Sequence, residues 1–154
     1  MAEIPIRAFI VSLVALRKTE TRHEVLLLKR TQTLVGEWCQ VAGKVEEGET
    51  AWQAALRELQ EETGLMPEAL YSADICEQFY EEDRDAITIA PVFVAFVKAT
   101  AEVSLNHEHS DYHWVSFDKA AEMVAFGGQR RVLSWIEDEF IERSPSKHLR
   151  IKGL

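Results

Sequence analysis

The segment GKVEEGETAWQAALRELQEETGL, residues 43–65, decides how this chain folds. Thr50 and Gln53 have the spacing of a capping box, in which a hydroxyl and an amide satisfy unpaired backbone groups at the start of a helix. The residues that follow are almost all good helix formers, and Gly64 is the residue type that ends helices in a left-handed conformation. The sequence therefore predicts a helix over residues 50–63.

Acidic side chains gather on one face of this predicted helix. Glu58, Glu61 and Glu62 are three and four residues apart, so their carboxylates lie on the same side. Like charges at this spacing repel by about 0.2–0.5 kcal/mol per pair, and the C-terminal half of a helix disfavours anions. A divalent cation would reverse both penalties, and ligation by oxygen alone suits Mg²⁺ or Mn²⁺ rather than zinc. A solvated helix face is the competing interpretation of the acidic string taken alone.

The full pattern is more specific than the acidic string. Written as G-x5-E-x7-R-E-L-x-E-E-x-G-L, it resembles a complete Nudix box, the signature of the Nudix hydrolase superfamily, and no fixed position departs from it. The wider chain fits the same domain, so the resemblance extends over about residues 5–142. It implies an α/β protein with the Nudix fold, an α/β/α sandwich around a mixed β-sheet. It also implies an enzyme that hydrolyses a diphosphate linkage, with Mg²⁺ as cofactor and Mn²⁺ as a substitute.

The same resemblance implies a role for each charged residue of the box. The arginine that matches Arg57 pairs with the glutamate that matches Glu49 and locks the loop against the helix. Glu58 and Glu62 match the usual metal ligands, and Glu61 matches a residue that is either a ligand or the base that activates water. Hard carboxylates suit a hard cation, and a carboxylate outside the metal shell can accept a proton from water.

Two further ligands are implied by residues outside the helix. The backbone carbonyl of Ala42, just before the box glycine, matches one that often completes the coordination. Residues 105–114, LNHEHSDYHW, resemble a segment of two Nudix subgroups in which a glutamate reaches the metal across the cleft, and this assigns Glu108 to that role. The histidines at 107, 109 and 113 are interpreted as structural or substrate-orienting rather than as a zinc cluster.

Candidate contacts to the substrate are cations and one aromatic residue. Lys44 follows the box glycine, and Lys29 and Arg30 end a predicted strand, so these three side chains are candidates to bind phosphate. Tyr80 is a candidate to stack on a base. The competing interpretations are solvated strand-end cations and, for the tyrosine, core packing.

Outside the box the chain reads as alternating strands and helices in a single domain, residues 1–154, with a core over about 5–142 and a loose tail over 143–154. Pro91 indicates an edge or a bulge within its strand. An apolar stripe on the box helix, which should pack on the sheet, consists of Ala51, Ala55, Leu56 and Leu59. The predicted strands are 6–17, 24–30, 38–41, 68–79, 87–98 and 112–116, and the further helices are 117–125 and 128–142.

Composition narrows the class of ligand. The net charge of -9 argues against binding of a nucleic-acid polymer, although a small nucleotide-like substrate is compatible with it because a metal offsets the charge.

The two cysteines form neither a disulfide framework nor a zinc pattern, so a reducing cytoplasm is the simplest setting. The apolar run at 8–16 is too short to cross a bilayer, and no membrane association is expected.

The substrate is not decided by the sequence. Lys44 stands where diadenosine tetraphosphate hydrolases usually carry histidine, which favours the group that resembles the dihydroneopterin triphosphate and dATP pyrophosphatases. We therefore expect hydrolysis of a nucleoside or pterin triphosphate that releases pyrophosphate, with asymmetric diadenosine polyphosphate cleavage second and nucleotide sugars or ADP-ribose third. A non-catalytic nucleotide-sensing module is the alternative of another class, and a homodimer stays open.

Overall fold

One mixed sheet forms the centre of the chain in the computed structural model, which describes residues 1–154. Its strands are β1 (Ile6–Arg7), β2 (Ile10–Lys18), β3 (His23–Arg30), β4 (Trp38–Cys39), β5 (Val41–Lys44), β6 (Ala69–Glu81), β7 (Ala86–Phe96) and β8 (His109–Val115). The order is β1-β7-β2-β3-β4, with β5 beside β2, β6 beside β7 and β8 beside β3. β7 runs parallel to β1 and β2, and the remaining pairs are antiparallel.

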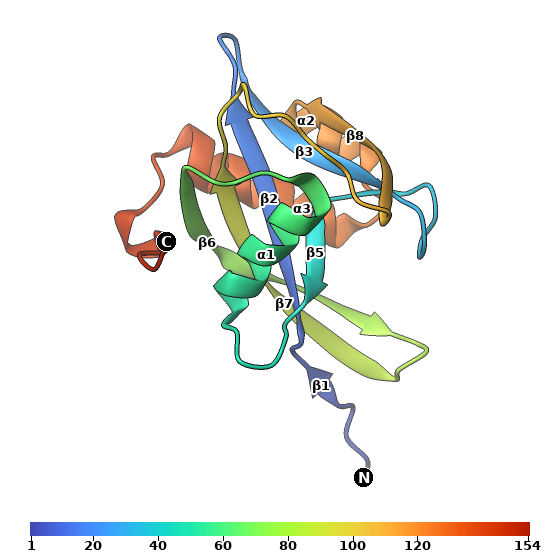
Figure 1. The fold of residues 1–154 in the computed structure, drawn as a ribbon. Coiled ribbons are helices and arrows are strands. Elements are labelled where there is room, and N and C mark those ends of the chain that lie inside the picture. Colours follow the sequence, from blue (N-terminus) through green and yellow to red (C-terminus); the bar gives the residue numbers. More distant parts are fainter.

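Helices cover both faces of this sheet (Figure 1). They are α1 (Ala51–Thr63), α2 (Phe117–Met123) and α3 (Gly127–Ile136), followed by a π-helical turn, η1 (Glu137–Glu142), and a 3-10 turn, η2 (Lys147–Leu149). One buried apolar cluster joins α1 to the sheet, and a second joins α2 and α3 to the opposite face. Alternate residues of β2 enter the two clusters, as the two-residue period of a strand requires. This is the α/β/α sandwich with a mixed sheet that the sequence predicted.

The box helix begins and ends where its sequence signals lie. Thr50 and Gln53 form both hydrogen bonds of the capping box, and Gly64 closes the helix at φ 72°. The predicted apolar stripe is partly wrong, because Ala54 is buried and Leu56 is only partly covered. The reason is that the helix turns a face centred on its carboxylates, and not a purely apolar face, toward the sheet.

Irregularities separate the predicted strands from the observed ones. The first predicted strand is divided between β1 and β2, and the third between β4 and β5. Opposite Pro91 the ladder of β6 and β7 shifts register between Ser72 and Cys76, with Asp74 at φ 58°. The expected bulge is therefore present, but it lies in β6, since β7 is an inner strand with neighbours on both sides.

The C-terminal residues run beside β6 (Figure 1). Arg150 forms a bridge to Tyr71, the amide of Ile151 donates to the carbonyl of Leu70 at 2.8 Å, and Ile151 packs against the cluster under α1. These contacts differ from the loose tail that the sequence suggested over 143–154. A polar segment can dock through its backbone, which composition does not reveal. None of the helices is both long and apolar enough to cross a membrane.

Candidate active site

Arg57 joins the loop before α1 to the helix itself. Its guanidinium donates to both carboxylate oxygens of Glu49, at 2.7 and 3.1 Å, and to the carbonyl of Lys44 at 2.9 Å. A two-oxygen pair of this kind fixes direction as well as distance. These bonds raise the pKa of Arg57, with Glu49 as the largest cause, and lower the pKa of Glu49. The loop is therefore held in one position against the helix.

The side chain of Glu58 packs against a backbone position that only glycine can occupy. The residue is 8% exposed, and its side chain lies against Gly43 of β5, where a Cβ atom would overlap the carboxyl group. One carboxylate oxygen accepts a hydrogen bond from Arg57 at 2.9 Å. Burial raises the pKa of Glu58, and the guanidinium of Arg57 acts in the opposite direction. The box glycine is thus required by the carboxylate that packs on it.

Glu62 is the most deeply buried of the acidic side chains. It is 2% exposed, and its Oε2 atom has no hydrogen-bond partner. Burial raises the pKa of Glu62 to about 9, and the nearby charges of Glu58 and Glu108 act in the same direction. An unpaired carboxylate in such a place costs free energy unless a positive charge joins it.

Glu108 reaches this group from the loop before β8. Thr31 anchors the loop, because its hydroxyl lies 2.9 Å from the carbonyls of both His107 and Glu108 and its amide donates to the latter carbonyl. The carboxyl group of Glu108 lies near enough to Glu62 to raise the pKa of Glu62. A residue 46 positions further along the chain than Glu62 therefore lies near this carboxylate of α1.

Glu61 differs from its two neighbours on α1 because it faces solvent. Its side chain is 53% exposed and its carboxylate lies 3.3 Å from Arg57. The sequence placed three glutamates on one face, whereas the structure buries Glu58 and Glu62 and leaves Glu61 at the rim. A carboxylate at the rim is accessible to water.

The donor set fits a hard divalent cation. As the side chains lie, no group of three or more His, Cys, Asp or Glu residues is arranged to hold a metal ion, and Arg57 draws Glu58 and Glu61 toward itself. The Oε2 atom of Glu62 nevertheless has no hydrogen-bond partner and lies near the carboxyl groups of Glu58 and Glu108, an arrangement that a cation would stabilise. The backbone of Ala42 also lies near Glu62 and acts to lower the pKa of Glu62. Carboxylate and backbone oxygens are the ligands that Mg²⁺ prefers.

The candidate substrate contacts do not all gather at these carboxylates. Arg30 is near, since its charge acts on His109, and its guanidinium is tied to the carbonyl of Thr33 at 2.8 Å. Lys44 and Lys29 alternate with residues of the cluster under α1, so their side chains point to the opposite face of the sheet. Tyr80 lies near the tip of the projecting β6–β7 hairpin (Figure 1), and its hydroxyl donates to Asp85.

Comparison with known proteins agrees with this geometry. The family model of the NUDIX domain matches residues 7–136. The chain belongs to the Nudix hydrolase family. The match covers the box, the sheet from Arg7 onward and all of α3, so the family resemblance seen in the sequence is confirmed.

Individual relatives of this Nudix chain differ in their named activities. An asymmetrical bis(5'-nucleosyl)-tetraphosphatase of Caenorhabditis elegans is 30% identical over 74% of this chain and 83% of that protein. The nucleoside triphosphatase NudI of Escherichia coli is 36% identical, over 77% of this chain and 78% of that protein. An octanoyltransferase of Myxococcus xanthus is 34% identical over 84% of this chain, which spans only 36% of that protein.

A solved structure supports the same assignment. The C. elegans Ap4A hydrolase, in a binary complex, superposes with a TM-score of 0.73 at 27% identity, covering 84% of this chain and 94% of that one.

Three positions of this Nudix site were not identified from the sequence. Gly43 was used only as part of the box pattern, although a glycine followed by acidic helix residues signals close approach of a side chain. Thr31 carries no signal beyond its place after a strand. His109 was grouped with two neighbouring histidines, but it alone of the three is buried. The register shift in the pairing of β8 with β3 separates it from His113, and His107 precedes β8.

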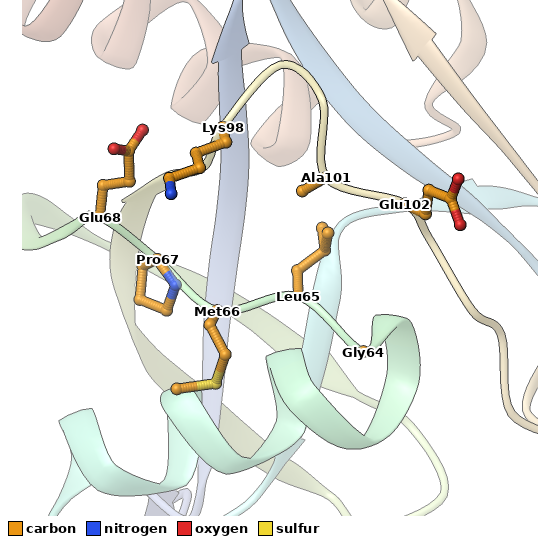
Figure 2. Close-up of a pocket in the computed structure, with 8 residues that line it drawn as sticks. All are labelled: Gly64, Leu65, Met66, Pro67, Glu68, Lys98, Ala101 and Glu102. Atoms are coloured by element: carbon orange, nitrogen blue, oxygen red, sulfur yellow. The ribbon is translucent and has the colours of Figure 1, made fainter.

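A surface cavity lies beyond the C-terminal end of the Nudix helix. It has a volume of about 510 Å³ and is lined by residues 64–68 together with Lys98, Ala101 and Glu102. Figure 2 shows these side chains coming from the end of α1 and from the segment after β7. None of the candidate catalytic or metal-binding residues lines it, so the chemistry is assigned to the carboxylates and not to this cavity.

Proposed function

We propose that this Nudix hydrolase uses Mg²⁺, with Mn²⁺ as a substitute, to cleave a diphosphate linkage in a nucleotide-like substrate. The single observation that carries the proposal is the buried carboxylate of Glu62, whose free oxygen lies beside Glu58 and Glu108. The proposed ligands are these three carboxylates, the backbone carbonyl of Ala42 and, in part, Glu61. A bound divalent ion neutralises phosphate oxygens and makes water a stronger nucleophile.

The protein's own residues position this chemistry. Arg57 holds Glu58 from one side while Gly43 lets the carboxylate approach the strand. Glu49 fixes Arg57, so the geometry does not depend on a flexible loop. Glu61 is proposed to accept the proton of the attacking water, because it is the exposed carboxylate next to the buried pair. Arg30 is proposed to bind a substrate phosphate at the edge of the site.

The substrate is proposed to be a nucleoside or pterin triphosphate, from which pyrophosphate is released. Lys44 in the box and similarity to a nucleoside triphosphatase over 77% of the chain support this choice. Asymmetric diadenosine polyphosphate hydrolysis is the second candidate. Similarity to tetraphosphatases, at 30–34% identity over 71–74% of the chain in four animal relatives, favours it.

A hydrolysis panel with resolved products tests the proposal. The panel contains deoxynucleoside triphosphates, dihydroneopterin triphosphate, diadenosine tetraphosphate, ADP-ribose and nucleotide sugars, each with Mg²⁺ and with excess chelator. Pyrophosphate from a triphosphate supports the first candidate, whereas ATP plus AMP from diadenosine tetraphosphate supports the second. Tight binding of a panel member without turnover would identify a sensor module and reject catalysis.

A further inference from the structure

Two buried polar atoms face each other beside the carboxylates. The Nδ1 atom of His109 lies 3.6 Å from Oε1 of Glu62, and neither Nδ1 nor the other oxygen of this carboxylate has a hydrogen-bond partner. The histidine is 8% exposed and the glutamate 2%. Orphaned polar atoms are rare in folded proteins, so one on each of two side chains in contact calls for an explanation.

The imidazole ring is held on its other side as well. Nε2 of His109 lies 3.8 Å from the Sγ atom of Cys39, whose thiol is 3.6 Å from the carbonyl of Leu28. His109 pairs with Arg30 where β8 joins β3, and this pairing fixes the backbone position of the ring. The ring therefore lies between a buried thiol and a buried carboxylate, with little freedom to turn.

The chemistry of the neighbours decides which nitrogen carries the proton. With a cation bound, the carboxylate of Glu62 is ionised and can only accept hydrogen bonds, so it requires an N–H at Nδ1 of His109. In a neutral ring Nε2 then carries no proton, and the thiol of Cys39 can donate to it only in place of its hydrogen bond to the carbonyl of Leu28. The carboxylate of Glu62 is therefore the neighbour that selects the tautomer.

We propose that His109 is a positioning residue that donates from Nδ1 to Oε1 of Glu62 and thereby directs Oε2 toward the divalent cation. The inference rests on the proposed function, in which Glu62 is a metal ligand. Carboxylates that bind metals are commonly held by a hydrogen bond on the oxygen that does not ligate. A shift of a few tenths of an ångström brings the 3.6 Å contact within hydrogen-bond range.

Three substitutions at one position separate this role from simple packing. The amide nitrogen of Asn reaches the position of Nδ1, that of Gln reaches the position of Nε2, and Leu keeps volume without a donor. We expect H109N to bind Mn²⁺ within about threefold of the parent protein, and H109Q and H109L to bind about 10–100-fold more weakly. H113Q is the matched control, because His113 is an exposed histidine on the same strand.

Mn²⁺ affinity is measured by electron paramagnetic resonance without substrate, and the thermal unfolding midpoint of each variant is measured with chelator. Weaker Mn²⁺ binding in H109Q and H109L, with H109N and H113Q unaffected, supports the proposal. Equal affinity in H109N and H109Q, whether both normal or both weak, overturns it. A packing role would instead order the variants by unfolding midpoint rather than by donor position.

The same variants are then assayed for hydrolysis, which separates the two proposals. Normal turnover with unchanged Mn²⁺ affinity in H109Q overturns the role of His109 and leaves the proposed function intact. Donor-dependent Mn²⁺ binding in a protein that hydrolyses no panel member supports His109 and rejects the function.

Discussion

The two ends of the acidic constellation on α1 satisfy their charges in opposite ways. Arg57 and Glu49 are paired through two hydrogen bonds at the loop end of the helix. Glu62, one and a half turns further along the helix, is more deeply buried and keeps a free oxygen beside other carboxylates. The charges of the first region are paired within the protein, whereas the carboxylate of the second region is paired only when a cation binds. Charges that a protein pairs internally serve its architecture, and those it buries unpaired are reserved for a ligand.

The largest expected effect comes from removing the charge of Glu58, which is paired with Arg57 and lies near the unpaired carboxylate of Glu62. E58Q keeps the oxygen that accepts from Arg57 but loses a unit of negative charge. Since a metal supplies several kcal/mol of charge stabilisation, we expect kcat to fall about 10³-fold or more at saturating Mg²⁺. The measurement is the initial rate on the best substrate of the panel, with circular dichroism to confirm the fold.

E47Q is the matched control for this prediction. Glu47 lies in the same box but is exposed, so its removal leaves the rate unchanged. Near-normal kinetics in E58Q would show that the buried carboxylates are structural and would falsify the proposed metal site.

Replacing Gly43, against which the side chain of Glu58 packs, has the next largest expected effect on activity. In G43A the new Cβ atom overlaps the carboxyl group of Glu58, which has to leave its position. We expect kcat/KM to fall about 10²-fold, because misplacing a reacting group by about 1 Å costs that much. G128A is the control, since a Cβ atom there meets only Arg131 at 3.8 Å. Equal rates in the two variants would mean that Glu58 can move without loss.

The paired end of the helix can be weakened without removing its charge. R57K keeps a cation but cannot donate through a planar fork to both oxygens of Glu49. We expect kcat to fall about 10-fold or more, as for other residues that hold a ligand in place. The loop should also become more sensitive to proteolysis, measured by limited digestion with chelator. A drop in rate with no change in digestion would indicate that Arg57 acts on the substrate and not on the loop.

The contrast between the two ends also explains what the sequence could predict. Local signals located α1 almost to the residue, because Thr50, Gln53 and Gly64 act within a turn of their own positions. The bulge near Pro91 was anticipated, but its strand was not, since that depends on which strands lie on either side of β7. The docking of Ile151 on β6 uses backbone atoms that every residue possesses.

In the candidate site, too, the features set by local sequence could be predicted and those set by strand neighbours could not. The glutamates of the box are recognisable because their spacing on one helix is fixed by 3.6 residues per turn. The burial of Glu58 was not predictable, since it depends on Gly43 of β5, and neither was the exposure of Glu61. His109 became distinct from His113 only through the register shift in the pairing of β8 with β3, and from His107 because that residue precedes β8. Spacing within an element is encoded locally, whereas the partner of a side chain is decided by topology.

The smallest expected effect concerns stability and tests the unpaired end directly. The pKa of Glu62 is raised to about 9 in the folded protein, so the folded state binds a proton that the unfolded state releases above pH 4.5. Stability therefore falls as pH rises between about 4.5 and 9. E62Q removes this loss, and with chelator present we expect it to be more stable than the parent at pH 8, by about 1–3 kcal/mol. Denaturant unfolding at pH 4 and pH 8 measures the difference, which should nearly vanish at pH 4.

Mg²⁺ should reverse the order of the two proteins at pH 8. A cation that binds only the folded state adds stability according to its concentration relative to its dissociation constant, and E62Q lacks the charge that attracts it. E49Q provides the comparison from the paired end: its partner is Arg57, so its stability should fall with and without Mg²⁺. If E62Q were instead the less stable protein in chelator at pH 8, both oxygens of the Glu62 carboxylate would have internal partners, and the division of α1 into a paired end and an unpaired end would be wrong.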